Sequence, residues 1–321
     1  MLNGDYMKKL TKKEIIGIIE LLICTMIWGF AFIAQKEASN YITPLFLNGI
    51  RFLIAGIILI PITIFIIYKE KKAGIYKGFT KALFIGFLMG LTLGIASNIQ
   101  QFGIERTTAG KAGFLTAMYI VLVPIFIFII FRKKLSVIQI IGIVVAVVGV
   151  GLISLKKDFS INLGDALCML GAVFFTVEII IVDYYSKEIN PFVLSMVCFI
   201  TIGVLSLFIA IPVDYNKFSM EGIKKAIIPL LFLSIGSSCI AYTLQNLGQQ
   251  KVDGTKASLI LCLESVFALI GSMILLDERL NLKEWFGSTL VLAGVFLVQL
   301  FAIKDEKLDN KETKIEENIE E

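Results

Sequence analysis

Long apolar runs separated by short polar loops make up most of the chain. A helix needs about 20 mostly apolar residues to cross a bilayer core of roughly 30 Å. The runs lack the alternation of a β-barrel strand, and helices satisfy their own backbone hydrogen bonds in lipid. The pattern therefore predicts an all-α polytopic membrane protein with ten transmembrane helices, at residues 15–34, 45–68, 79–101, 108–131, 136–155, 163–183, 191–212, 226–248, 255–276 and 283–303.

Composition supports this prediction and excludes other classes. The chain is 57% hydrophobic and 17% charged, whereas an ordinary soluble domain is about 25% charged. That balance excludes a soluble enzyme and argues against a nucleic-acid partner. The chain has no histidine, which removes imidazole metal sites and Ser-His-Asp triads. We therefore expect a non-enzymatic protein that lies in membrane lipid and needs no cofactor or metal.

The distribution of lysine and arginine predicts the orientation of the chain. Of the 30 basic residues, 19 lie on the side of both termini and 10 on the opposite side, with Arg51 inside a predicted helix. Basic loops tend to stay in the cytoplasm. Both termini are thus predicted to be cytoplasmic, with the protein in the cytoplasmic membrane. Residues 1–14 form the cytoplasmic N-terminus, and residues 304–321, with eight acids, form a disordered cytoplasmic tail.

The sequence contains an internal repeat. A shift of 145 or 147 residues aligns positions that are identical or similar: Gln100 with Gln245, Gly103 with Gly248, Gly142 with Gly287, Gly149 with Gly294, Trp28 with Phe175 and Pro44 with Pro191. Each repeat, 15–155 and 163–303, holds five predicted helices. Because five is odd, the second repeat enters the membrane upside down. Inverted repeats place a site near the midplane and suit alternating access, so this pattern predicts a transporter of a small-molecule substrate.

Four segments resemble the motifs of EamA-type transporters in the drug/metabolite transporter superfamily: Ile27-Trp28-Gly29-Phe30, Arg51-Phe52-Leu53-Ile54-Ala55-Gly56, 108–124 and 275–298. The resemblance covers about residues 13–303. It implies a ten-helix fold in which the fifth and tenth helices are peripheral and the others surround a central cavity. It also implies export or uptake of small metabolites, often amino acids or related compounds.

The chain departs from the family pattern at two places. Where the second repeat has Asp277-Glu278-Arg279, the first has Arg132-Lys133-Lys134, so its terminal glutamate is absent. The ninth predicted helix has Leu263-Glu264-Ser265 where many relatives have Glu-Pro. We expect this second difference to remove a kink from that helix.

Two carboxylates lie deep inside the predicted helices. Glu264 is near the middle of the ninth helix and aligns with Tyr119, whereas Glu178 is in the sixth helix and aligns with Ala31. Ionisable groups inside a membrane cost roughly 2.5–3.5 kcal/mol each, so they usually face a cavity or a partner. Each carboxylate can carry a proton, pair with a substrate ammonium group or form a structural hydrogen bond. Glu20, nearer the cytoplasmic end, is expected to be solvated.

Two other side chains, Arg51 and Trp28, each have a functional and a structural interpretation, and two lysines are expected to need a partner. Arg51 can bind a substrate carboxylate, or it can cap or anchor a helix near the periplasmic side. Trp28 can stack on a substrate or pack beside Gly29. Lys111 and its equivalent Lys256 lie at helix N-termini, where the dipole does not stabilise a cation, so we expect each to have another partner.

Neutral polar residues are candidates either to line the cavity or to join helices by hydrogen bonds: Asn98, Gln100, Gln245 and Tyr242. Small residues also recur at four-residue spacing, as Gly86, Gly90 and Gly94 in the third predicted helix. That spacing predicts close helix packing.

These features predict a secondary transporter that moves a small metabolite, an amino acid or a related compound, by export and alternating access. The candidate residues for substrate binding or proton coupling are Glu264, Glu178, Tyr119, Trp28, Arg51, Gln100, Gln245, Asn98 and Tyr242. The apolar interior also fits a flippase for a lipid or lipid-linked metabolite, which stays as an alternative. Proton coupling, and the choice between monomer and homodimer, stay open.

Overall fold

The computed structural model describes residues 11–74, 79–132, 135–155, 160–185, 189–249, 251–252, 257 and 260–298. Both predicted terminal segments lie largely outside these ranges. The described part consists of helices and of a single isolated β-bridge between Leu155 and Ile161. The longer helices are α1 (Lys12–Ala38), α2 (Pro44–Lys72), α3 (Phe79–Arg106), α5 (Tyr119–Phe131), α6 (Val137–Ser154), α7 (Leu163–Tyr185), α8 (Pro191–Asp214), α13 (Glu264–Leu275) and a last helix at residues 282–298.

Local sequence signals account for where several helices begin. Thr11 and Glu14 form a capping box at the start of α1, and Ser136 and Gln139 form another at the start of α6. Asn190 accepts two backbone hydrogen bonds at the start of α8. Such caps satisfy amide groups that have no partner inside the helix.

Within the described ranges, eight helical stretches are long and apolar enough to cross a membrane. They are Lys12–Ala38, Pro44–Lys72, Phe79–Arg106, Ala109–Ile130, Val137–Ser154, Leu163–Ile181, Pro191–Lys217 and Ile227–Gln249. Large apolar side chains on their outer faces, such as Phe84 and Phe208, are strongly exposed, as helices that face lipid require. The first eight predicted spans therefore each correspond to a helical stretch of sufficient length, and the chain is a multi-pass membrane protein.

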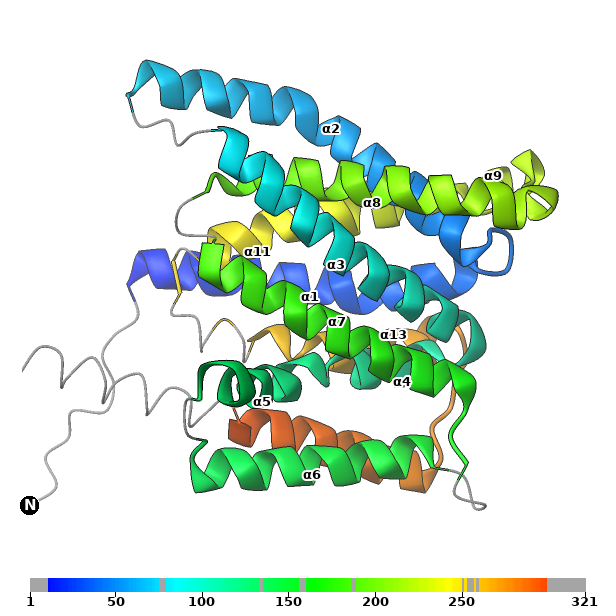
Figure 1. The fold of residues 1–321 in the computed structure, drawn as a ribbon. Helices are drawn as coiled ribbons and strands as arrows, with labels where there is room; N and C mark the ends of the chain where they lie inside the picture. Colours follow the sequence, from blue (N-terminus) through cyan, green and yellow to red (C-terminus); the bar gives the residue numbers. More distant parts are fainter. Residues whose placement is uncertain are drawn as a thin grey trace, which may run out of the picture.

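The helices pack in layers (Figure 1). At the top of the view α2, α3 and α8 lie together, and α2 packs along α8. At the bottom α6 lies beside the orange helix 282–298, so these two helices form one edge of the bundle. A Cβ placed at Gly142 would lie 2.8 Å from the carbonyl oxygen of Gly294, and one at Gly149 would lie 2.7 Å from that of Gly287. The two backbones are therefore in direct contact.

The predicted span 108–131 is interrupted. It forms α4 (Ala109–Thr116) and α5, separated by a turn at Ala117 and Met118. Around this turn the backbone amides of Met118, Ile120 and Val121 each bond to a carbonyl three residues earlier. Bonds of that kind tighten a helix. The interruption needs no proline, since Pro124 lies beyond it.

A second interruption lies in the ninth predicted span. Cys262 and Leu263 form a turn directly before Glu264, the first residue of α13, and the amide of Leu263 bonds to the carbonyl of Ile260. The expectation that the absent proline removes a kink here is therefore wrong. The same tightening that divides the first repeat's helix also divides this one.

The eighth predicted span is helical throughout its described length but changes its winding. It consists of α10 (Ile227–Leu231), the π-helical η2 (Phe232–Ala241) and α11 (Tyr242–Gln249). A π-helix is wider than an α-helix and often lies at a functional site. Two short elements, η1 (Tyr215–Lys217) and α9 (Met220–Lys225), connect this span to α8.

We predict that Gly203→Ala lowers the stability of the protein. A Cβ at Gly203 would lie 2.7 Å from the backbone nitrogen of Leu53 on α2, so the helices must separate. The expected loss is about 1–3 kcal/mol, measured as thermal unfolding of the purified protein in detergent. Gly94→Ala is the matched control, because its Cβ would approach Ile202 only to 3.5 Å. A Gly203→Ala variant that unfolds at the wild-type temperature would contradict this packing.

Candidate functional site

Tyr242 lies at the centre of an aromatic cluster. It follows the π-helical segment, and its ring packs edge-on against Trp28 of α1 and Phe199 of α8, at centroid distances of 4.9 and 5.2 Å. The indole Nε1 of Trp28 donates a hydrogen bond of 3.1 Å to the carbonyl of Ser237. Trp28 therefore packs against η2 and α11 rather than only beside its neighbour Gly29.

The two intramembrane carboxylates lie close to this cluster. Glu178 on α7 is only 7% exposed, and Glu264 is partly buried at the first position of α13. Both are within electrostatic range of the Tyr242 hydroxyl, and Glu264 is also within range of Tyr119 at the start of α5. The structure therefore brings together five predicted residues from five separate spans, Trp28, Tyr119, Glu178, Tyr242 and Glu264.

The interrupted helices place Tyr119 and Glu264 at this centre. The backbone carbonyl of Glu264 lies close to Gly29 of α1: a Cβ atom added to Gly29 would lie 2.9 Å from the carbonyl oxygen. The carbonyl of Tyr119 accepts a hydrogen bond of 3.4 Å from Thr176 of α7. As the first residue of α13, Glu264 also has its carboxylate at the positive end of the helix dipole, which favours a negative charge.

Arg51 lies about two turns into α2. Its side chain is buried, donates a hydrogen bond of 2.9 Å from Nη1 to Oε1 of Gln35, and lies over the Phe52 ring. It is within electrostatic range of Tyr242. Its Nε has no hydrogen-bond partner. The guanidinium group thus belongs to the margin of the central site.

The other predicted polar residues join helices. Asn98 donates hydrogen bonds to Ser206 of α8 and accepts one from Asn48 of α2. Gln100 donates to Thr116 of α4 over 2.9 Å. Gln245 is partly buried on α11, about one turn beyond Tyr242, and its backbone contacts the Cys24 thiol. Asn98 and Gln100 are therefore structural in the conformation described.

Three further amide side chains are buried, and two of them, Asn48 and Gln35, were not singled out from the sequence. Asn48, Gln35 and Gln101 are each 5% exposed or less. The signal that could have identified them is a polar residue at or near the end of an apolar run, since lipid offers it no hydrogen bond. Together with Arg51 they form a polar cluster on α1, α2 and α3.

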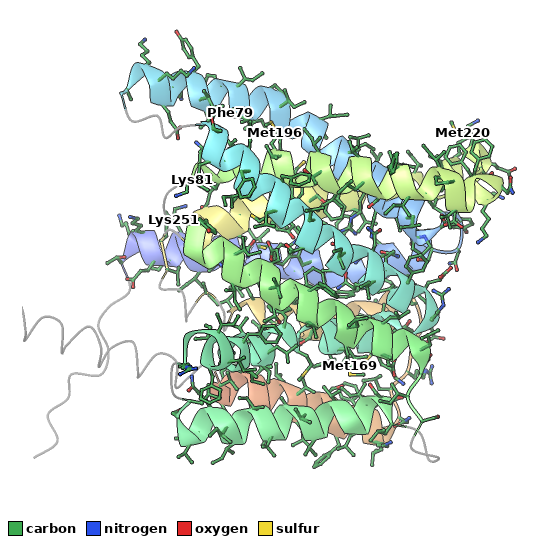
Figure 2. The ribbon with its side chains drawn as sticks, viewed as in Figure 1. Phe79, Lys81, Met169, Met196, Met220 and Lys251 are labelled. Carbon is green, nitrogen blue, oxygen red and sulfur yellow. The ribbon has the colours of Figure 1, made fainter. Side chains whose placement is uncertain are left out.

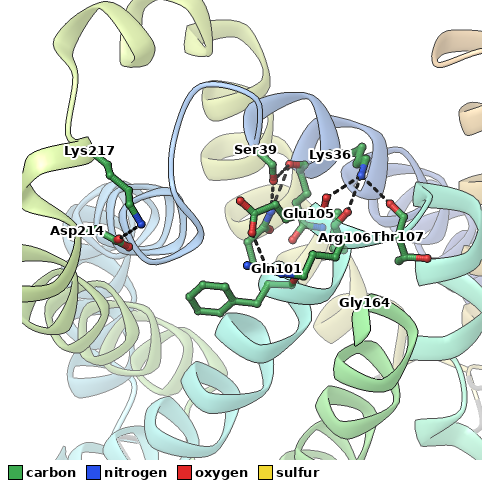
Figure 3. Close-up of polar contacts among 12 residues, drawn as sticks. Lys36, Ser39, Gln101, Glu105, Arg106, Thr107, Gly164, Asp214 and Lys217 are labelled. Atoms are coloured by element: carbon green, nitrogen blue, oxygen red, sulfur yellow. Dashed lines mark hydrogen bonds and ion pairs between the residues drawn. The ribbon is translucent and has the colours of Figure 1, made fainter. Parts of the chain in front are cut away.

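A set of polar contacts closes one end of the bundle (Figure 3). The ammonium group of Lys36 donates hydrogen bonds to the carbonyls of Ile104, Glu105 and Thr107, at 3.0, 3.0 and 2.6 Å. The Thr107 hydroxyl also bonds to Asp165 near the start of α7. These contacts tie the C-terminal ends of α1 and α3 to the N-terminal end of α7.

The opposite end of α1 has its own ion pair. Lys251, labelled in Figure 2, pairs with Glu20, and both side chains are largely buried. The expectation that Glu20 is solvated is therefore wrong, because the loop that follows α11 supplies a cation at this depth.

Lys111, which was expected to need a partner at the N-terminus of α4, has an anionic partner. Lys111 forms an ion pair with Glu284 in the last helix. Beside it, the carboxylate of Glu278 accepts hydrogen bonds from the amides of Ala109 and Gly110, at 3.0 and 3.2 Å, and so caps α4. The glutamate of the second repeat's closing motif thus stabilises a helix of the first repeat. The equivalent Lys256 lies outside the described residues.

Fold and site together define a polytopic membrane protein with a buried polar and aromatic centre, the arrangement of a membrane transporter. The profile of the EamA-like transporter family matches the chain twice, over residues 15–155 and 162–300. The chain belongs to this family, as the sequence motifs predicted.

Similar proteins include other transporters. The chain is 30% identical over 288 residues to an "uncharacterized transporter" of Archaeoglobus fulgidus, covering 90% of this chain and 87% of that protein. It is 25% identical to the transporter YoaV of Bacillus subtilis, covering 89% and 96%, and 25% identical to a chloroplastic WAT1-related protein of Arabidopsis thaliana, covering 84% and 66%. A solved crystal structure, 15% identical, shares the fold with a TM-score of 0.63 over 92% of this chain and 99% of that one.

We predict that Glu278→Ala loosens α4. Removing the carboxylate leaves the amides of Ala109 and Gly110 without their partner, at an expected cost of about 0.5–2 kcal/mol. The measurement is hydrogen exchange of the α4 amides, which is expected to become faster. Asp277→Asn is the control, because Asp277 is exposed and its φ of 51° suits asparagine. Unchanged exchange in Glu278→Ala would refute the capping role.

Proposed function

We propose that the chain is a secondary transporter in the cytoplasmic membrane that exports a small metabolite, an amino acid or a related compound, by alternating access. The observation that carries this proposal is the meeting of two interrupted helices at the aromatic centre. Transporters form substrate sites near the midplane from discontinuous helices. Here the interruptions precede Tyr119 and Glu264, which are equivalent positions of the two sequence repeats.

The proposed architecture is ten transmembrane helices in two inverted repeats. Glycine contacts between the two sequence repeats support this architecture, because each contact has an equivalent when the repeats are exchanged. The Cβ positions of Gly56 and Gly203 lie 3.0 and 2.7 Å from the backbone nitrogens of Ile200 and Leu53, respectively. A shift of 147 residues exchanges these two contacts with each other. The double match of the family profile supports the same repeat.

Equivalent contacts also close both ends of the bundle. At one end Gly103 of α3 packs on the carbonyl of Gly164, and at the other Gly248 of α11 packs on that of Gly17. Repeat alignment pairs Gly103 with Gly248 and Gly17 with Gly164. In the proposed cycle one of these closures opens while the other stays shut, so that the central site faces each side of the membrane in turn.

Within this proposal the central carboxylates bind substrate or carry a coupled proton. Besides Tyr119, Tyr242 and Arg51, the described ionisable groups nearby are the buried thiols of Cys24, Cys198 and Cys262. A proton bound at Glu178 or Glu264 and released on the other side would couple transport to the proton gradient.

We predict that Glu264→Gln and Glu178→Gln each reduce transport by about tenfold or more while the protein still folds. The amide keeps the size of the side chain and removes its charge and its proton. The assay is counterflow into proteoliposomes of a pooled set of labelled amino acids and related metabolites, with and without a pH gradient. The control is Glu221→Gln, since Glu221 is exposed and forms only a surface pair with Lys225.

The outcomes of this assay separate the alternatives. Wild-type rates in both variants at every pH would overturn substrate or proton handling by these carboxylates. Uptake of no water-soluble compound by the folded protein, with flux of a lipid analogue, would replace the proposal by lipid flipping.

We predict that both termini lie in the cytoplasm. In intact cells a membrane-impermeant maleimide is then expected to label a Lys225→Cys variant, on α9, and not a Lys72→Cys variant, at the end of α2. Both positions are exposed, and the five native cysteines are buried, which keeps the background low. The reverse labelling pattern would show the opposite orientation.

A further inference from the structure

We propose that the central site recognises a protonated amine, so that the carried compound is an organic ammonium ion held by Glu178, Glu264 and the rings around Tyr242. This inference rests on the proposed transport function and names the chemical group which that site selects.

The first observation is that Glu178 has no hydrogen-bond or ion-pair partner in the part of the chain that the structure describes. Its side chain is 7% exposed on α7, and it forms no hydrogen bond or ion pair with the described residues. A carboxylate withdrawn from water is costly unless a cation or a hydrogen-bond donor accompanies it. Its neighbours within electrostatic range are Tyr242 and Cys198, and neither is a cation.

The second observation is that the protein's own buried cations are engaged elsewhere. Four lysine or arginine side chains in the described ranges are at least partly buried. Lys36 bonds to three carbonyls at the end of α3, Arg51 bonds to Gln35, Lys111 pairs with Glu284, and Lys251 pairs with Glu20. None of these four described cations is therefore paired with Glu178 or Glu264, and we infer that the carried compound supplies the cation at this site.

The third observation is the aromatic cluster beside the carboxylates. Trp28, Tyr242 and Phe199 pack edge to face, and the bond from Trp28 to Ser237 fixes the orientation of the indole ring. Aromatic faces attract ammonium groups, most strongly where water is excluded. Carboxylates and rings together thus favour a positive group over a neutral or negative one.

Arg51 limits how the amine is oriented. Its guanidinium group is also within electrostatic range of Tyr242, so it repels a cation on the α2 side of the site. The ammonium group is therefore directed toward α7 and α13, where Glu178 and Glu264 lie. A carboxylate on the same compound is not required, because Gln35 already accepts a hydrogen bond from Arg51.

The test compares three probes of similar shape: benzylamine, benzyl alcohol and benzoate. Each is added at increasing concentration during counterflow of the labelled pool. Benzylamine is expected to inhibit at a concentration about tenfold lower than either other probe. Glu178→Gln and Glu264→Gln are expected to remove that preference, Trp28→Leu to weaken it, and Glu221→Gln to keep it. Inhibition by benzoate at an equal or lower concentration would overturn the proposal, as would a preference that survives both glutamine variants.

A second measurement separates this proposal from the proposed function. Thermal unfolding of the purified protein with each probe reports binding without transport. Stabilisation by benzylamine alone, lost in the glutamine variants, supports the amine site even where no compound in the pool is carried. Transport without any preference for benzylamine, in flux or in unfolding, leaves the transporter standing and removes the amine site.

Discussion

Close contact between helix backbones holds this bundle together. In lipid, apolar side chains gain little from leaving the hydrocarbon for one another, so association depends on tight packing and on hydrogen bonds between helices. Glycines supply that packing where α2 crosses α8 and where α6 crosses the last helix, with backbone atoms of one helix less than 3 Å from the Cβ position of the other. Such close crossings set the spacing of the helices between which the central side chains lie.

The same constraint governs the charges. A charged group inside the bundle needs a partner, and the structure provides one for each partly buried cation that it describes. These pairs lie toward the ends of the helices, at Lys36, Lys111 and Lys251, where they also tie one element to another. The centre is different, because Glu178 and Glu264 lie near Tyr242 and form no ion pair with any described cation, while Arg51 at the margin bonds to Gln35. The described buried cations toward the ends therefore have partners within the chain, and the two carboxylates at the centre form no such pair with a described cation.

Much of the fold could be predicted from the sequence because the length of an apolar run shows directly whether it can span the membrane as a helix. The first eight spans were placed correctly, although α2 and α3 continue several residues into the polar loops, since a helix does not end where the bilayer does. The interruptions at Ala117 and Cys262 were not predicted. They arise from hydrogen bonds to carbonyls three residues earlier, and neither glycine nor proline marks the turns.

Part of the site could also be predicted, because the internal repeat shows which positions are equivalent. Repeat alignment placed Tyr119 and Glu264 at one depth, and in the structure the two side chains are within electrostatic range of each other. It also predicted that Lys111 needs a partner. That the partner is Glu284, far along the chain, depends on tertiary packing, as does the ion pair between Glu20 and Lys251. A single sequence can show that a buried charge needs a partner. It does not show which residue that partner is, because tertiary packing decides this.

Three departures from internal symmetry lie at or near the centre. Glu178 aligns with Ala31, Glu264 aligns with Tyr119, and the π-helical segment η2 has its counterpart in the regular helix α3. The paired glycine contacts at the two ends, in contrast, are alike. The proposed alternating access requires two closures of similar strength, so that neither state is too stable to leave, and equivalent contacts suit that requirement. Binding one kind of molecule requires an asymmetric set of groups, and at the centre the two halves contribute different ones.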